Sequence, residues 1–322
     1  MSEPPQQADP SQGSAPREPE PPPEVVALAE ARAAARAQRT FDRADELRDE
    51  LAAAGWAVRD EPGGGFALTP MAPEVDGSDD RRDEPAVDVS LHWVFEGWPG
   101  DIDRAIAGFR AHAGSWTMQF VVADVTGQRP GRWGADVEVV SLPPGTGWAT
   151  ARNAGLERNR GAIVLVLDGS VEPVGDVVTP LAAALADPQV GFAGPFGLVT
   201  TDLRRFDEAP GPGPCDALEG YLIAMRREVL ERVGGADERF RWYRNADIEW
   251  SFRVKDAGLR TEVVEVPVTT HEHRAWASTS LEDRERLSRR NFNRFLDRWR
   301  DRWDLVLAGE PARGAGPPSG AR

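Results

Sequence analysis

The pattern of apolar and polar residues changes several times along the chain, and these changes divide the chain into segments. Residues 1–23 contain Pro, Glu, Gln and Ser with few apolar side chains, and residues 305–322 end in a run of Gly, Pro and Ala. Such segments bury too little apolar surface to offset the entropy that is lost on ordering. The pattern therefore predicts flexible tails at both ends.

Residues 24–70 have the pattern of a small module of two helices and a hairpin. The second predicted helix carries apolar residues at helical spacing on one face, and Gly55 follows as its stop signal. The segments WAVRD and FALT then alternate in the manner of strands, with EPGGG between them as the turn. A polar, proline-bounded linker is predicted at residues 71–85. The apolar face of the second helix consists of Phe41, Ala44, Leu47 and Leu51.

From residue 86 to residue 304 the pattern changes to apolar strands separated by helices. The segments VDVSLHWVF, MQFVVAD, VEVVSL and AIVLVLD have the character of buried strands, and IDRAIAGFRAHA and TARNAGLERN that of helices. A regular alternation of this kind predicts an α/β fold, with a mostly parallel sheet covered by helices on both faces. In such sheets, ligands bind at the carboxyl ends of the strands.

Composition narrows the classes of protein that fit. The chain has 322 residues and a net charge of -15, which disfavours non-specific binding of nucleic acid because the average field repels phosphate. Cys215 is the single cysteine, so neither a disulfide framework nor a zinc site of cysteines is expected. The longest apolar runs are far shorter than the roughly 20 residues of a membrane helix, and the first residues lack a basic, apolar leader. These features predict a cytoplasmic protein with no membrane span.

The segment ATARNAGLERNRGAIVLVLDGS, residues 149–170, predicts a helix followed by a buried strand that ends at Asp168. It resembles the inverting family 2 glycosyltransferases of the GT-A type, in which an Arg-Asn-x-Gly helix precedes an apolar strand with a terminal Asp-x-Asp motif. The resemblance implies a GT-A fold, a Rossmann-like mixed sheet flanked by helices, over residues 86–304. It also implies that Arg152, Asn153 and Asp168 bind a nucleoside-diphosphate sugar.

The metal motif departs from the family pattern. The family's second Asp binds Mn²⁺ or Mg²⁺, and Ser170 stands in its place as a donor-side residue. A hydroxyl is a weaker ligand for a hard divalent cation than a carboxylate. The resemblance therefore leaves Asp168 and His271 as the expected metal ligands, with Mg²⁺ or Mn²⁺ as the cofactor.

Two further strand and helix ends complete the resemblance. Asp124 ends the strand MQFVVAD, where the family has an Asp that recognises the nucleotide base. In LEGYLIAMRREVLERVGGADERFRWYRNADIEWSFRVKDAGLR, Asp247 matches the family's general base, which takes the proton of an acceptor hydroxyl. Gly235, Glu249 and Arg253 are expected on the acceptor side. The acceptor itself stays unknown. The segment NADIEWSFRV also has the pattern of a helix start, and the two descriptions are compatible.

Two alternatives remain open. The segment PGTGWATARNAGLE, with Asp168 about 20 residues further on, has part of a dinucleotide-binding fingerprint. Thr150 occupies the place of its third glycine, and the unit lies in the middle of the alternating region. The second alternative is a catalytically degenerate glycosyltransferase that binds a nucleotide sugar or a partner, which Ser170 and Ala246 in place of family carboxylates favour.

The segment FDRADELRDELAAAGWAVRDEPGGGFAL resembles the C-terminal segment of cysteinyl-tRNA synthetase, near the anticodon-binding region. No nucleotide-binding motif of a synthetase is present, so aminoacylation does not follow. The resemblance makes tRNA a candidate partner, while pairing of the segment's arginines with acidic neighbours on solvated helix faces is the competing interpretation. These arginines are Arg32, Arg36, Arg39, Arg43 and Arg48.

Overall fold

The computed structural model describes residues 21–38, 40–54, 56–60, 65–70, 84–127 and 133–309. The chain divides into two compact units, residues 1–73 and residues 74–322. The predicted flexible tails and the predicted linker fall largely outside the described residues. Among the residues that are described, no helix has the length and apolar character to cross a membrane.

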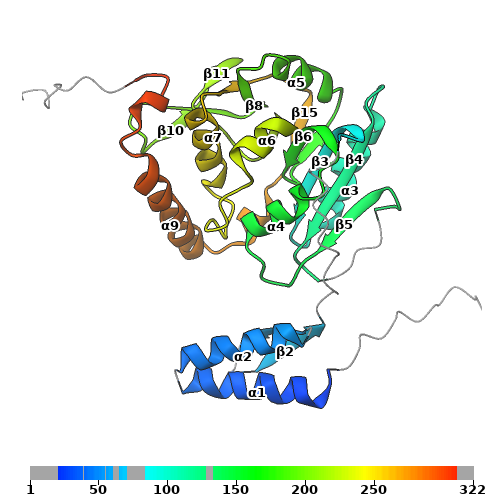
Figure 1. Cartoon of the computed structure of the whole chain (residues 1–322), viewed down its shortest axis with the longest axis vertical. Helices are drawn as coiled ribbons and strands as arrows, with labels where there is room; N and C mark the ends of the chain where they lie inside the picture. Colours follow the sequence, from blue (N-terminus) through cyan, green and yellow to red (C-terminus); the bar gives the residue numbers. More distant parts are fainter. Residues whose placement is uncertain are drawn as a thin grey trace, which may run out of the picture. The chain divides into compact units, whose positions relative to one another are not determined.

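The small unit consists of two packed helices and an antiparallel strand pair, as the pattern predicts (Figure 1). Its core joins residues from both helices and from the first strand. Leu51 is fully buried there, against Val25, Ala29 and Trp56. The elements are α1 (Pro23–Ala37), α2 (Phe41–Ala53), β1 (Trp56–Asp60) and β2 (Phe66–Pro70).

The large unit is built on an eight-stranded mixed sheet. The strand order is β11, β14, β8, β13, β6, β3, β4, β5. The pairs β6–β3, β3–β4, β4–β5 and β8–β14 are parallel, whereas β13 runs antiparallel to both of its neighbours. The strands are β3 (Val87–Phe95), β4 (Met118–Asp124), β5 (Val137–Ser141), β6 (Gly161–Leu167), β8 (Val190–Gly194), β11 (Gly213–Cys215), β13 (Leu222–Arg226) and β14 (Arg260–Val263).

Alternate residues of the central strands face two separate apolar layers. In β6, Leu165 and Leu167 pack in the layer that contains α3 (Pro99–Ala111) and α5 (Val178–Leu185). Val164 and Val166 pack in the opposite layer. That second layer includes α4 (Trp148–Leu156), α6 (Arg227–Val233) and α7 (Ala246–Asp256). Helices on both faces of the sheet explain why the strand segments are almost continuously apolar.

Shorter elements close the unit around the ends of these strands. Helix α9 packs against α7 through a third apolar cluster that includes Phe252, Phe295 and Trp299, and Figure 1 shows the two helices side by side. The strands β7 and β15 pair antiparallel, as do β9 with β10 and β12. The elements are β7 (Val171–Pro173), β9 (Gly197–Thr200), β10 (Phe206–Glu208), β12 (Ala217–Leu218), β15 (Val268–Thr270), α8 (Arg274–Ser278), α9 (Leu281–Trp299) and the 3₁₀ turn η2 (Trp303–Leu305).

Candidate functional site

A cavity of about 450 Å³ lies where β6 ends and α7 begins. Its lining includes Asp168 from the end of β6, Asp247 from the first turn of α7, and Arg152 from α4. A smaller cavity, lined by Glu96 and Ser170, shares Asp168 with it. The location at the carboxyl end of a parallel strand is the one that the sheet topology predicts for a ligand.

Asp168 is fixed by bonds to both its backbone and its side chain. Its amide donates to the Tyr221 carbonyl at 3.0 Å, which ties the end of β6 to the start of β13. The carboxylate accepts a hydrogen bond from the Ser170 amide at 2.8 Å, and the His273 Nε2 atom lies 3.3 Å from its other oxygen. Burial alone would raise the pKa of this carboxyl, but His273 and Ser170 outweigh burial and hold it below the usual value.

The histidine beside Asp168 is His273, whereas the sequence hypothesis assigned that place to His271. The His271 side chain turns to Glu172, with Nε2 and the carboxylate oxygen 2.6 Å apart, and it lines neither cavity. The Nδ1 atom of His273 accepts from the Trp276 amide at the start of α8. Because Nδ1 accepts, the neutral imidazole carries its proton on Nε2 and points it at Asp168.

Aromatic rings surround His273 on the cavity side. Tyr243 stacks on the imidazole with ring centres 4.6 Å apart, and Tyr221 meets it edge-on at 5.7 Å. Trp276 stacks on Trp242 at 5.8 Å. Burial raises the pKa of the Tyr243 hydroxyl, which has no hydrogen-bond partner among the described residues. A buried hydroxyl in a cavity wall is a ready donor to a polar ligand.

Arg152 and Asn153 of the Arg-Asn-x-Gly helix have different environments. The Arg152 guanidinium is buried, donates to the carbonyls of His92 and Leu167, and lies over the Trp148 ring. Burial lowers its pKa to about 10, although Asp168 and Glu96 oppose the shift. Asn153 does not line either cavity. Its side-chain amide instead donates to the Ala236 carbonyl and accepts from the Ala236 N–H, and so joins α4 to the loop after α6.

The position of Gly235 leaves no space for a side chain. A Cβ atom at this position would lie 2.2 Å from the Asn153 side-chain oxygen, which is closer than such atoms approach. The glycine therefore permits the contact between α4 and the loop after α6. It does not line the cavity.

Asp124 is fully buried at the end of β4, two strands from β6 in the sheet. One carboxylate oxygen accepts from the amide and hydroxyl of Thr126. The other oxygen has no hydrogen-bond partner among the described residues. A buried acceptor without a partner is costly, so this atom is suited to a donor group on a ligand. Asp124 itself lies outside the lining of the two cavities.

Asp247 is held by two backbone amides. One oxygen accepts from Gly220 at 2.8 Å and the other from Ile248 at 2.9 Å. Burial raises the pKa of this carboxyl, and the two amides only partly oppose the shift. A carboxylate has about four acceptor sites, so two remain to receive a proton from a substrate. A raised pKa makes the group a stronger base.

Two glutamates near these aspartates were missed by the sequence reasoning. Burial and the Asp247 charge raise the pKa of Glu219 to about 7, and it lines the main cavity. Glu96 lines the smaller cavity, where the surrounding walls and the Asp168 charge raise its pKa to about 7. In the sequence, these glutamates are marked only by their position directly after a strand. The carboxylates that lie near them in the structure come from other segments, so the sequence does not show the pairs.

Asn245, the residue just before α7, has an unusual backbone conformation. Asn245 has φ of 65°, in the left-handed region, and its side chain makes no cap bond to α7. Its amide instead reaches the Ser288 carbonyl of α9, and the residue lines the cavity. The predicted helix start is thus present, with a strained residue at the cavity wall. Strain of this kind collects at functional sites.

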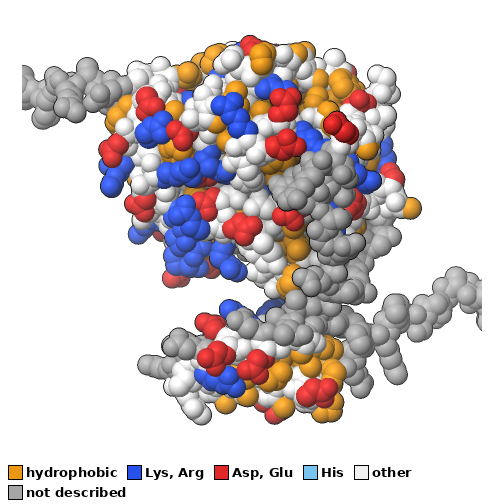
Figure 2. All heavy atoms as spheres, viewed as in Figure 1, with side chains coloured by type: hydrophobic (Ala, Val, Ile, Leu, Met, Phe, Trp, Pro, Cys, Tyr) orange, Lys and Arg blue, Asp and Glu red, His pale blue; other side chains and the backbone are white. Residues whose placement is uncertain are grey.

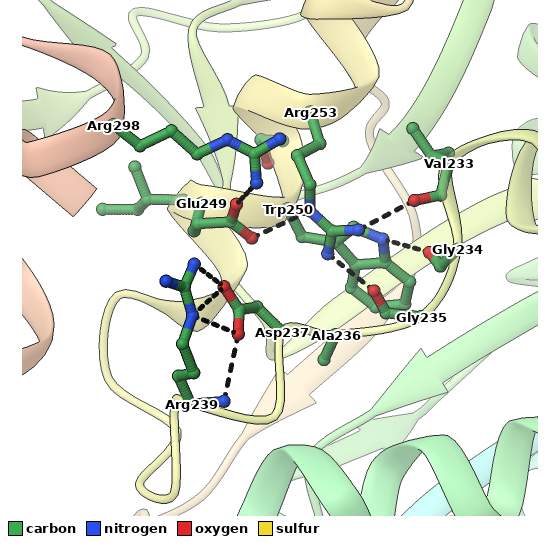
Figure 3. Close-up of polar contacts among 12 residues, drawn as sticks. Val233, Gly234, Gly235, Ala236, Asp237, Arg239, Glu249, Trp250, Arg253 and Arg298 are labelled. Atoms are coloured by element: carbon green, nitrogen blue, oxygen red, sulfur yellow. Dashed lines mark hydrogen bonds and ion pairs between the residues drawn. The ribbon is translucent and has the colours of Figure 1, made fainter. Parts of the chain in front are cut away.

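Glu249 and Arg253 lie away from the cavity lining, in a buried ion-pair network (Figure 3). Glu249 is only 2% exposed and bonds Arg253 and Arg298, each at 2.9 Å. Arg253 also donates to the carbonyls of Val233 and Gly235. The pair thus ties α7 to α9 and to the loop after α6. Contact with an acceptor is not part of this arrangement.

The residues at Asp168 fit a divalent cation only in part. Within the described part of the chain, no group of three His, Cys, Asp or Glu side chains could hold a metal. Asp168 supplies one carboxylate. The Nε2 atom of His273 points its proton at this carboxylate, so it offers no lone pair to a cation. A Mg²⁺ or Mn²⁺ ion here would take most of its ligands from water and a diphosphate, which is an ordinary arrangement for Mg²⁺.

Arginines of the small unit are paired with its own carboxylates. Arg32 bonds Asp60 at 2.7 Å, and Arg36 lies 3.3 Å from the same carboxylate. Arg43 pairs with Glu46, and Arg48 with Asp45. Arg39 lies outside the described residues. This arrangement favours the solvated-face interpretation over contacts to RNA phosphate.

Comparison with known proteins supports both resemblances. A family model described as the cysteinyl-tRNA ligase anticodon binding domain matches residues 18–66. Pre-mycofactocin glycosyltransferases of two Mycobacterium tuberculosis strains, CDC 1551 / Oshkosh and H37Rv, are 28% identical to this chain over 156 residues. That match covers 43% of this chain, and the chain spans about a third of those relatives, 33% of their length.

The large unit has the glycosyltransferase GT-A fold. The crystal structure of GalNAc-T7 with UDP, GalNAc and Mn²⁺ superimposes with a TM-score of 0.53 and 17% sequence identity. The superposition covers 68% of this chain and 50% of the GalNAc-T7 chain. The predicted fold class is thereby confirmed, whereas membership of family 2 stays a prediction.

The Glu249 network generates a test of its structural role. Replacing Glu249 with Ala leaves the mostly buried Arg253 guanidinium without its carboxylate, and we expect a loss of about 3 kcal/mol in the free energy of unfolding. Urea denaturation followed by tryptophan fluorescence measures it. Arg298→Ala is the matched control, because its side chain is 43% exposed and should cost less than about 1 kcal/mol. Equal, small losses in both variants would contradict the account.

Proposed function

We propose that the large unit is an inverting glycosyltransferase that moves a sugar from a nucleoside-diphosphate sugar to an acceptor hydroxyl. The observation that carries the proposal is the placement of Asp168 and Asp247 in the walls of one cavity. The carboxylates come from segments nearly 80 residues apart and have opposite pKa shifts. In such a pair, the carboxylate with the lowered pKa, Asp168, is suited to stay charged, and the one with the raised pKa, Asp247, is suited to take a proton. The GT-A fold and the similarity to a glycosyltransferase support the same reaction.

The donor is assigned to the side of the cavity where β3, β4 and β6 end. Asp124 offers its unpaired buried oxygen to an imide or amine of the nucleotide base. Two guanidinium nitrogens of Arg152 donate to carbonyls, and its charge interacts favourably with that of Asp168, so Arg152 is assigned the role of keeping Asp168 ionised. Asn153 is assigned a supporting role, because it positions α4 through Ala236.

A divalent cation is proposed at Asp168, shared with the diphosphate. Such an ion supplies neutralisation of the charge that develops on the departing diphosphate. Ser170 is buried beside Asp168 and gives its amide to that carboxylate. Because no group of three possible ligands is present among the described residues, cation binding should depend on the presence of the nucleotide. GalNAc-T7, whose fold the unit shares, was crystallised with Mn²⁺.

Asp247 is the proposed general base. The acceptor oxygen forms a bond to the anomeric carbon while the bond from that carbon to the diphosphate oxygen breaks, and the diphosphate leaves with the electron pair. The acceptor proton passes to a free lone pair of Asp247. Attack from the face opposite the leaving group inverts the anomeric centre. The amides of Gly220 and Ile248 fix the carboxylate while it accepts the proton.

Asp247→Asn tests the base directly. With water in place of the unknown acceptor, the protein should slowly release nucleoside diphosphate from its donor sugar. The amide cannot take a proton, so we expect the rate to fall about 10²-fold or more. Chromatographic assay of released diphosphate measures the rate, and the circular dichroism spectrum and melting temperature should stay close to those of the parent. An undiminished rate in a folded variant would sink the proposal for Asp247.

The neighbouring Glu219 gives a test through pH. The Asp247 charge raises the pKa of Glu219, and because the repulsion between two carboxylates is mutual, their titrations are coupled. Because a base works only when it is ionised, the rate should fall as the pH drops through the raised pKa of Asp247. Glu219→Gln removes the negative charge, lowers the pKa of Asp247 and should move the acid limb of the pH–rate profile to lower pH. An unmoved limb, or a move to higher pH, would exclude this coupling.

A degenerate protein that binds nucleotide sugars without transfer is the second candidate. Ser170 in place of a carboxylate is the observation that favours it. Donor binding without any release of diphosphate, in the parent and in Asp247→Asn alike, would establish this candidate.

A further inference from the structure

Several arginines that make no hydrogen bond or ion pair to an oxygen line the main cavity. In the described part of the large unit, the guanidinium groups of four arginines make no hydrogen bond or ion pair to a carboxylate or carbonyl oxygen. Three of them, Arg204, Arg244 and Arg289, line the cavity. The fourth, Arg290, follows Arg289 in α9. In a chain with a net charge of -15, unpaired arginines at one place require an explanation.

These arginines come from three segments that contribute to the lining of the cavity that contains Asp247. Arg204 follows β9, Arg244 precedes α7 and Arg289 belongs to α9. The donor groups Asp124 and Asp168 instead end β4 and lie just after β6. The positive charge therefore belongs to the region assigned to the acceptor.

The outer surface of α9 continues the positive charge. Arg286, Arg290 and Arg294 follow one another at spacings of four residues, which places them on one face of the helix; Arg286 also pairs with Asp283, and Arg294 donates to the Arg239 carbonyl. Figure 2 shows Lys and Arg side chains gathered over α9. Partial burial and the charges of Arg294, Arg286 and Arg241 lower the pKa of Arg290. Like charges at this spacing destabilise a helix, and a bound anion would relieve the repulsion.

Apolar and aromatic walls accompany the arginines. Phe206 and Phe292 line the same cavity, together with Trp276. Arg244 lies over the Trp276 ring at 5.5 Å. Guanidinium groups bind phosphate or carboxylate through two parallel hydrogen bonds, while the Trp276 ring is already covered by Trp242, Arg244 and Arg284.

We propose that the acceptor is an acidic saccharide with phosphate or carboxylate groups. One anionic group binds between Arg204, Arg244 and Arg289 in the cavity, and a further one lies on the outer face of α9. This inference rests on the proposed function. It adds the chemical class of the acceptor, which Asp247 alone does not define.

A nucleic acid fits these observations less well. The three arginines from Arg286 to Arg294 span about 12 Å of helix, enough for a few anionic groups but short for a longer strand. The net negative charge and the paired arginines of the small unit oppose a wider contact. RNA is therefore the alternative that the experiment must separate.

Isothermal titration calorimetry of the full chain in 50 mM salt tests the inference. Trigalacturonate is compared with neutral maltotriose, and glucose 6-phosphate with glucose. We expect both anionic probes to bind more tightly than their neutral matches, and less tightly in 300 mM salt. Arg204→Gln combined with Arg289→Gln should weaken anionic binding about 10-fold or more, because two charged hydrogen-bond donors are lost.

Arg300→Gln is the matched control, since Arg300 is an exposed arginine at the end of α9 that lines no cavity and pairs with Asp301. It should bind as the parent does. UDP and GDP are titrated in parallel. If neither binds, the proposed function fails first. If one binds while the anionic probes bind no better than the neutral ones, the acceptor inference alone is wrong.

Two other results would also overturn the inference. One is equal loss of anionic binding in Arg300→Gln, because the effect would then be non-specific. The other is tighter binding of a 20-nucleotide RNA than of trigalacturonate, with the RNA lost in the double variant, which would identify a nucleic acid as the ligand. A double variant that loses UDP or GDP binding instead would place the arginines on the donor side.

Discussion

The backbone of Gly220 and Tyr221 connects the two carboxylates on which the site depends. The Tyr221 carbonyl accepts from the Asp168 amide, and the Gly220 amide donates to the Asp247 carboxylate. These bonds exist because β13 runs antiparallel beside β6, so that the start of one strand lies at the end of the other. A peptide of two residues thus fixes the two carboxylates relative to each other. Other features of the site, including the His273 contact and the position of α7, are arranged around this connection.

Much of the fold could be predicted from the sequence because its signals are local. The strand β6 is continuously apolar and β3 and β4 are largely so, and the residues at their ends are the ones that the alternation singled out. The helical module at the N-terminus was equally clear from its apolar face and turn. The antiparallel insertion of β13 was not evident from the pattern, because strand direction depends on pairings between distant segments.

The site was predicted less completely than the fold. Asp168 and Asp247 do share a cavity, as the motifs implied. His271 and His273 are two residues apart, and only the pairing of β15 with β7 decides that the second one reaches Asp168. Glu249 is likewise two residues from Asp247, but the helix turns it into the ion-pair network with Arg253. Spacing along the chain cannot separate these cases, since they depend on which face of each element meets a neighbour.

Charge is distributed so that an acidic protein offers positive charge at one place. Most of the described arginines of the large unit are bonded to carboxylates or carbonyls, which uses part of their capacity to bind anions. Three arginines without a hydrogen bond or ion pair to an oxygen, Arg204, Arg244 and Arg289, line the same cavity as Asp247. The carboxyl pKa values move in opposite directions within this cavity, because His273 and Ser170 lower that of Asp168 while burial raises that of Asp247.

The central claim is that the cavity binds a nucleoside-diphosphate sugar through Asp168. The most direct measurement is a thermal unfolding series of the full chain with nucleoside-diphosphate sugars, each with Mn²⁺, with Mg²⁺ and with a chelator. A ligand at about 100 times its Kd stabilises a protein by about 2.7 kcal/mol, so one nucleotide should raise the melting temperature by several degrees when metal is present. Asp168→Asn should lose most of that rise. No rise with any nucleotide sugar, or the same rise in Asp168→Asn, would contradict the claim.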